Sequence, residues 1–196
     1  HWFGEVRALQ AFLEKTLAVT VTPDKLKEAI RRMNERRRTL RSFYEFTKSD
    51  PAYLTGCERL LLNQRIACTP LEKELLEAVR SELERRRAAN QAVAPEKTPR
   101  ILVTGVPIGP DVDKAIRLIE ECGGLVVVQE ACTGVKPLYE DVAETGDPLE
   151  AIARKYFHLP CSCLTPNQER FTLLDRLAGV FRVHGVVDVI WLACHT

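Results

Sequence analysis

The chain has 196 residues with 28 basic and 27 acidic side chains, so its net charge is +1. That balance excludes a nucleic-acid binder that works through bulk positive charge, because no excess of cations exists to displace counterions. With 45% hydrophobic and 28% charged residues, the composition is that of a folded globular protein. No apolar run approaches the ~20 residues that cross a bilayer, so we expect neither a nucleic-acid nor a membrane partner.

Charge and glycine content divide the chain near residues 94–99, a Pro-containing segment that resembles a linker. Residues 1–98 carry 19 basic and 14 acidic side chains but only two glycines. Residues 99–196 carry 9 basic and 13 acidic side chains with the other eight glycines. We therefore predict a helical connector region over 1–98 and an α/β domain over 99–196.

Apolar residues recur at helical spacing in three stretches of the first half. The first helix is expected to begin at Trp2, and the second to cover 23–46 with Thr22 as its N-cap. A third amphipathic helix is expected over 69–87. Acidic residues interleave with the arginines of 31–41, which indicates a solvated helix face, with docking onto an acidic partner as the alternative.

The second half alternates short apolar runs with helical patterns. Strands are expected near 101–104, 125–129 and 186–192, and helices over 114–122, 148–156 and 167–181. Strands buried on both faces and separated by helices indicate a three-layer α/β/α domain with a parallel, doubly wound sheet. Because such a short sheet looks truncated, we expect an exposed apolar edge, and with it poor solubility or self-association of the isolated chain.

Seven cysteines are the anomaly of this composition. An odd count, in a chain that opens without an initiator Met or a signal-peptide pattern, argues against a disulfide framework and favours a cytoplasmic protein with reduced thiols. Ligands of parallel sheets lie at the carboxyl ends of the strands. Cys132 follows the second predicted strand, Cys194 follows the last, and Cys161 and Cys163 lie in a loop between two helices. These four thiols are candidate ligands of a metal or a cluster.

Other interpretations of the thiols remain open. Cys57, Cys68 and Cys122 are expected to be packing residues, since cysteine is common as a small buried hydrophobe. Zinc is an alternative to a cluster, held by the four scattered candidate cysteines with His158 or His195.

The segment Gly105–Pro110 follows a strand and precedes a helix, as a phosphate-binding loop does. It lacks the Gly-x-Gly-x-x-Gly spacing and the Gly-Lys-Ser/Thr ending, and its two prolines remove backbone amides. Cys161 and Cys163 are separated by one residue, unlike the two residues of a thioredoxin-like redox pair. Neither motif therefore indicates a nucleotide site or a dithiol redox centre.

Three cysteine segments share a pattern with a known family. They are Glu130-Ala-Cys132-Thr-Gly134, the segment from Tyr156 to Arg170 with Cys161 and Cys163, and Leu192-Ala-Cys194-His195. These segments resemble the 2-hydroxyacyl-CoA dehydratase/benzoyl-CoA reductase superfamily, which includes the 2-hydroxyglutaryl-CoA dehydratase D-component. The order of elements from Arg100 onward is similar to the carboxy-terminal domain of that family.

The resemblance implies an oxygen-sensitive iron–sulfur cluster held between two similar α/β domains, and a separate ATP-dependent iron–sulfur activator that supplies low-potential electrons. In the dehydratases the cluster is a [4Fe-4S] cubane, and in a sister branch it is a double-cubane cluster. The implied ligands here are Cys132, Cys161, Cys163 and Cys194. The number of these cysteines resembles that of the double-cubane branch, because each added thiolate can support more iron.

The resemblance therefore implies an iron–sulfur component of a dehydratase or reductase that acts on an acyl-CoA or another small molecule. The family's homologous amino-terminal domain has no counterpart here, so we expect a carboxy-terminal fragment that is inactive alone and joins that domain and a second subunit. The competing interpretation is a non-enzymatic α/β domain whose thiols pack or bind zinc.

Overall fold

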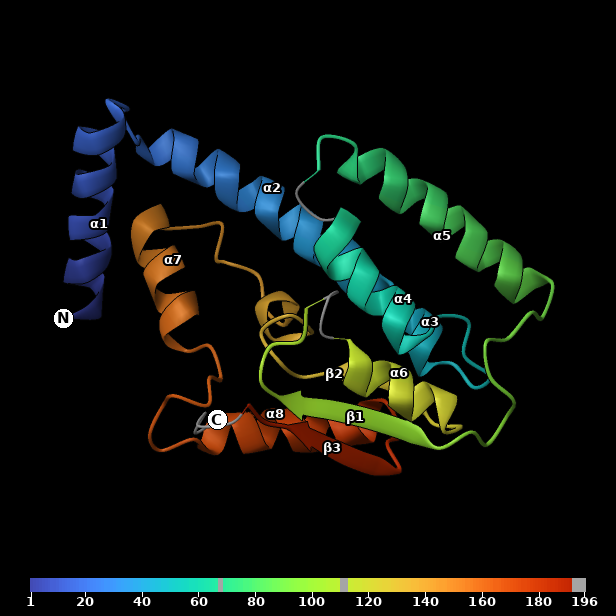
Figure 1. Ribbon diagram of the computed structural model, residues 1–196. Helices are drawn as coiled ribbons and strands as arrows, with labels where there is room; N and C mark the ends of the chain where they lie inside the picture. Colours follow the sequence, from blue (N-terminus) through green and yellow to red (C-terminus); the bar gives the residue numbers. More distant parts are fainter. Residues whose placement is uncertain (67–68, 110–112, 192–196) are drawn as a thin grey trace. The chain divides into compact units, whose positions relative to one another are not determined.

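The computed structural model describes residues 1–66, 69–109 and 113–191 (Figure 1). The chain divides into two compact units. The helical unit consists of His1–Thr39 and Leu138–Leu159, and the sheet unit of Leu40–Pro137 and Pro160–Thr196. The division at residue 98 stays a prediction. Within the described ranges, none of the helices is long and apolar enough to cross a membrane.

The helical unit is built from α1 (Trp2–Leu17), most of α2 (Pro23–Ser42) and α7 (Pro148–Phe157). The indole N–H of Trp2 donates a 2.8 Å hydrogen bond to the carbonyl of Ala153, which joins α1 to α7. Asp147 caps α7 by accepting from the backbone N–H of Glu150 at 2.8 Å. These contacts place the first predicted helix against one that lies far along the chain.

The arginine-rich face of α2 is not uniformly solvated, contrary to the expectation from its sequence. Arg37 is buried and donates to Asn34 at 2.8 Å and to the hydroxyl of Tyr156 at 3.2 Å. Arg38 is half-exposed and pairs with Asp141 at 2.7 Å. Arg37 is buried because it lies three positions after the buried Asn34 and therefore shares its side of the helix.

The sheet unit contains the strands and the remaining helical segments. In chain order these are α3 (Glu45–Lys48), α4 (Gly56–Leu61), the π-helix η1 (Leu62–Ile66), α5 (Glu72–Ala88), β1 (Arg100–Gly105), α6 (Lys114–Glu121), β2 (Leu125–Gln129), the 3-10 turn η3 (Lys136–Leu138), α8 (Gln168–Val180) and β3 (Gly185–Val189). The second predicted helix therefore ends at Ser42, and α3 begins after a short turn.

The sheet is parallel with strand order β2-β1-β3, which confirms the predicted topology. Val103 of β1 and Val126 of β2 pack with Ile116 of α6 in one apolar core. On the opposite face, Arg170 of α8 donates to Thr104 of β1 at 3.1 Å. Helices therefore flank both faces of the sheet, as the α/β interpretation requires (Figure 1).

β3 is an edge strand in the part of the chain that the structure describes. It pairs with β1, and the register runs from Ile101 opposite Gly185 to Gly105 opposite Val189. Gly105 has φ +100°, and a Cβ there would lie 2.1 Å from the carbonyl oxygen of Val189. Only glycine lets β1 and β3 stay together at this point.

A buried arginine joins the beginning of β1 to two helix ends. Arg100 is 3% exposed and donates to the carbonyls of Thr47 at 2.6 Å and of Phe181 at 2.8 Å. It also donates to the carbonyls of Lys48 and Ser49 at 3.2 and 3.1 Å. Desolvation by burial lowers the pKa of the Arg100 guanidinium from its ordinary value. The cation satisfies carbonyls that the ends of α3 and α8 leave without helical partners.

Candidate functional site

The predicted thiols lie around the loops that follow β2 and precede α8. Cys132 is exposed and comes three residues after β2 ends. Cys161 is half-buried and Cys163 is exposed, and both precede α8. None of these three cysteines forms a disulfide. Cys194 lies outside the described residues, as do Cys68 and His195, so the structure places only three of the four candidates.

A tight turn presents Cys132. The N–H of Val135 donates to the carbonyl of Gln129 at 2.8 Å and closes the turn around the cysteine. A Cβ at Gly134 would lie 2.0 Å from the same carbonyl oxygen, so this position accepts only glycine. Ala131 and Val135 are buried, whereas Cys132 between them is exposed. The turn therefore directs one thiol out of an otherwise buried segment.

Side chains of the π-helix η1 form hydrogen bonds with the Cys132 turn and with the neighbouring Gly105–Pro110 loop. Asn63 donates to the carbonyl of Thr133 at 3.2 Å, and Gln64 donates to the carbonyl of Ile108 at 2.9 Å. The N–H of Ile108 in turn donates to the Thr133 hydroxyl at 3.0 Å. Sequence reasoning missed Asn63 and Gln64, because a π-helical turn has no pattern of its own in the sequence.

These contacts also bear on whether the Gly105–Pro110 loop could bind phosphate through its backbone amides. The N–H of Val106 donates to the carbonyl of Val189 at 2.9 Å, and that of Ile108 is bound to Thr133. A phosphate-binding loop needs free amides that point at the ligand. The amides of Val106 and Ile108 are therefore occupied within the protein.

A buried ion cluster lies directly behind the Cys132 turn. Glu130 is 0% exposed, and its carboxylate lies 2.7 Å from the ammonium of Lys136, which is 2% exposed. The other carboxylate oxygen accepts a 2.7 Å hydrogen bond from the Thr104 hydroxyl and lies 3.6 Å from Nε of Arg170. A charge so deeply buried requires this kind of compensation. Sequence reasoning found Glu130 only as part of a motif and did not identify Lys136 or Arg170.

The thiol of Cys161 lies in surroundings that favour its thiolate. Its pKa is lowered, first by a hydrogen bond from the backbone of Cys163, and further by the Cys163 thiol, the charge of Lys136 and Ser162. Burial of the thiol opposes these effects. Thiolates are the form that binds metals. Cys161 and Cys163 are therefore close enough to interact, and Lys136 acts on both Glu130 and Cys161.

The cysteines predicted as packing residues differ from one another. Cys57 packs against the core of Val103 and Ile116, which confirms the prediction. Burial and the carboxylate of Glu120 raise the pKa of the Cys57 thiol to about 12. Cys122 is exposed where α6 ends, so its predicted packing role is wrong. The side chain projects outward because the chain leaves the helix there before turning at the glycine that follows.

The type of donor fits an iron–sulfur cluster, since Cys132 and Cys163 are exposed thiols and Cys161 is a half-buried one. Within residues 1–66, 69–109 and 113–191, no three His, Cys, Asp or Glu side chains converge as a metal site. The three described thiols are thus suitable in chemistry, and a complete ligand set requires further residues.

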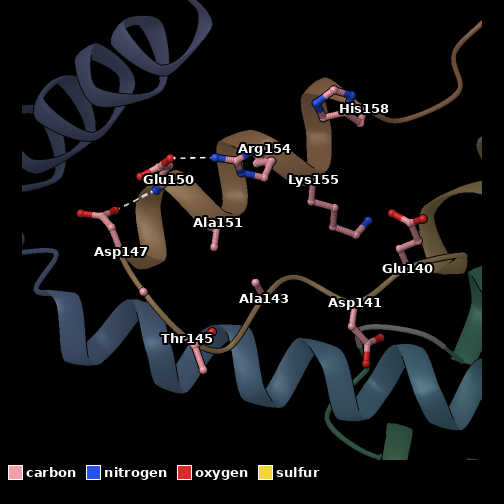
Figure 2. A pocket seen from close by; sticks show the side chains of 11 residues that line it. Glu140, Asp141, Ala143, Thr145, Asp147, Glu150, Ala151, Arg154, Lys155 and His158 are labelled. Atoms are coloured by element: carbon pink, nitrogen blue, oxygen red, sulfur yellow. Dashed lines mark hydrogen bonds and ion pairs between the residues drawn. The ribbon is translucent and has the colours of Figure 1, made fainter.

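The helical unit contains an open cavity of about 480 Å³ beside α7. Three of its charged groups are bound within the protein: Arg154 pairs with Glu150 at 3.0 Å, and Asp147 caps the helix. Figure 2 shows Lys155 directed toward Glu140. The cavity is lined by Glu140, Asp141, Ala143, Thr145, Gly146, Asp147, Glu150, Ala151, Arg154, Lys155 and His158.

His158, the residue considered for zinc, lies at the end of α7 with its ring packed edge-on against Phe157. In the described part of the chain it does not join a group of metal-ligating side chains. The cavity is therefore a less convincing site than the thiols of the sheet unit.

Comparison with known proteins agrees with the cysteine pattern. All of residues 1–196 match the model of the family described as "2-hydroxyglutaryl-CoA dehydratase, D-component". The chain is also 39% identical over 199 residues to an Escherichia coli (strain K12) protein named "Putative dehydratase subunit YjiM". That alignment includes 100% of this chain and 51% of the relative, so the chain spans about half the length of the curated relative that it matches.

Proposed function

Since this chain belongs to the 2-hydroxyglutaryl-CoA dehydratase D-component family, we propose that it is the cluster-binding carboxy-terminal part of a 2-hydroxyacyl-CoA dehydratase-like enzyme or of a double-cubane-cluster reductase. The observation that carries the proposal is the presence of two suitable thiols. Cys132 is exposed on a tight turn, and the surroundings of Cys161 lower its thiol pKa. Cys132 follows Glu130 by two residues, and the charge of Lys136 acts on Cys161.

Four cysteines would hold the cluster: Cys132, Cys161, Cys163 and Cys194. The first three are supported by their position at the loops around the carboxyl end of β2, and Cys194 by the motif that contains it. When bound, the cluster would supply single low-potential electrons for reduction of an acyl-CoA or another small substrate. The chain's own contribution would be to present thiolates and to orient them from fixed turns.

The partners that we propose follow from family membership and from the length of the relative. They are the homologous amino-terminal domain, a second subunit and an ATP-dependent iron–sulfur activator. Because such thiols must stay reduced, we propose a cytoplasmic location.

Anaerobic purification of the full-length gene product tests the proposal, with iron and acid-labile sulfide measured per chain. We expect both in comparable amounts, together with visible absorbance of a cluster. Zinc without iron would reject the cluster and favour the non-enzymatic α/β domain.

Single Cys→Ser variants of the same product test the ligands. Cys194→Ser and Cys132→Ser are expected to lose iron, whereas Cys57→Ser and Cys122→Ser should keep the wild-type amount. Full iron content in Cys194→Ser, or an equal loss in Cys122→Ser and Cys132→Ser, contradicts the proposed ligand set.

A further inference from the structure

We propose that Glu130 is a positioning residue that holds the Cys132 turn and the Cys161–Cys163 segment in the arrangement needed to receive the cluster. This inference rests on the proposed function and deepens it. In this role the Glu130 carboxylate contacts neither the substrate nor the iron–sulfur cluster. It fixes the relative placement of the segments that carry the thiols.

The contacts of Glu130 reach three separate parts of the sheet unit. Thr104 at the end of β1 donates to its carboxylate at 2.7 Å. Lys136, which follows the Cys132 turn, lies 2.7 Å from the other carboxylate oxygen. Nε of Arg170, near the beginning of α8, lies 3.6 Å from the carboxylate oxygen that accepts from Thr104, and Arg170 also donates to the Thr104 hydroxyl at 3.1 Å. One side chain thus joins the end of β1 to the segments on either side of the candidate thiols.

The sequence positions of Lys136 and Arg170 explain how the buried ion cluster affects the placement of the thiols. Cys132 lies between Glu130 and Lys136 in the chain, so the ion pair closes the turn that carries it. Arg170 is the third residue of α8, the helix that follows Cys161 and Cys163, so its contact with Glu130 anchors that loop at its far end.

Stability alone is a weak reason for a fully buried ion pair. Removing charges from water costs free energy that their attraction only partly offsets, and apolar residues of similar size often serve the fold as well. What these groups provide is placement, because the hydrogen bond from Thr104 to Glu130 requires a defined distance and angle and both cations must lie within reach of the same carboxylate. Residues behind metal ligands commonly act in this way, and their loss weakens metal binding by about 10–100-fold.

The test compares Glu130→Gln with Glu120→Gln in the full-length gene product. Glu120 is a matched control because its carboxylate also lies in the sheet unit and accepts from the backbone of Gly56 at 2.7 Å and of Val126 at 3.4 Å, at the beginning of β2. Urea unfolding gives the stability of each variant. Cadmium titration of the reduced, metal-free protein, followed by sulfur-to-metal absorbance, gives the affinity with which the thiols bind Cd²⁺.

We expect Glu130→Gln to bind Cd²⁺ about 10-fold more weakly than wild type or worse, and to incorporate less iron with an altered visible spectrum. Glu120→Gln is expected to keep both properties, even where its stability falls as much. Wild-type Cd²⁺ affinity and iron spectrum in Glu130→Gln would overturn the positioning role, as would equal losses in both variants.

Arg170→Gln covers the case in which Glu130→Gln does not fold. This change removes the Arg170–Glu130 contact of the buried ion cluster, where the arginine side chain is 12% exposed. It leaves the Glu130–Lys136 pair in place. Weakened Cd²⁺ binding in this folded variant supports the inference, and unchanged binding contradicts it. Absence of iron from the wild-type protein would reject the proposed function, whereas the comparison of Cd²⁺ affinities would still decide the role of Glu130.

Discussion

The side-chain amide of Asn34 and the backbone of Val142 bind each other in both directions. The amide N–H donates to the Val142 carbonyl at 2.7 Å, and the Val142 N–H donates to the amide oxygen at 2.9 Å. Asn34 is 0% exposed, so these hydrogen bonds replace contacts with water. They attach the segment before α7 to the middle of α2 within the helical unit.

Asn34→Ala is expected to reduce the free energy of unfolding by about 2–3 kcal/mol, because it leaves the Val142 backbone groups buried without partners. Urea unfolding measures the loss, and amide hydrogen exchange at Val142 is expected to accelerate. Glu35→Ala is the control, since Glu35 is exposed on the same helix, and its effect should stay within about 0.5 kcal/mol. Equal effects of the two changes would contradict this role of Asn34.

Arg100→Met is expected to cost about 3 kcal/mol or more, because a buried guanidinium that donates to four carbonyls is replaced by a group that donates none. Arg182→Met is the matched comparison. Arg182 is exposed and donates to the Lys48 carbonyl at 2.7 Å, so its loss should change little. Thermal and urea unfolding of both variants provide the measurement, and a stable Arg100→Met protein would refute the prediction.

Lys136→Met is expected to destabilise the protein by about 3–5 kcal/mol, because it leaves the carboxylate of Glu130 buried without its nearest cation. The double variant Lys136→Met with Glu130→Gln should recover part of this loss, since no uncompensated charge then remains. A double-mutant cycle from urea unfolding tests the coupling. Additive losses would show that the two side chains act independently.

Cys57 is expected to resist alkylation at neutral pH. Its thiol pKa is raised to about 12 by burial and by Glu120, and only the thiolate reacts with iodoacetamide. The unfolded chain loses this proton near the ordinary thiol pKa while the folded chain keeps it. The contribution of Cys57 to stability is therefore complete below that value and is lost as pH rises toward 12.

Mass spectrometry after timed iodoacetamide treatment measures the reactivity of each cysteine. At pH 8 the exposed Cys122 should be modified well before Cys57, and the rate at Cys57 should keep rising through pH 10 and above. Equal rates for the two cysteines at pH 8 would contradict the predicted difference.

The regular elements of the sheet unit could be predicted from the sequence because their signals are local. Apolar runs of four or five residues, separated by helical periodicity, predict β1, β2 and β3 and a parallel sheet. The capping box of α4 was also present in the sequence, where the Thr55 hydroxyl accepts from the Glu58 N–H and the Glu58 carboxylate accepts from the Thr55 N–H. Such patterns depend only on residues that are neighbours in the chain.

The polar interior required the tertiary structure. Nothing near Glu130 in the sequence indicates that Arg170 lies beside it, nor does the arginine-rich pattern of α2 show that Arg37 is buried. The sequence by itself determined the three strands and the longer helices but not α3, α4 or η1, since hydrophobic periodicity is a property of contiguous residues and is clear only over longer segments. Only the tertiary structure decided which charged side chains lie beside one another. A buried ion pair depends on the position and direction of both partners, which come from segments distant in the chain.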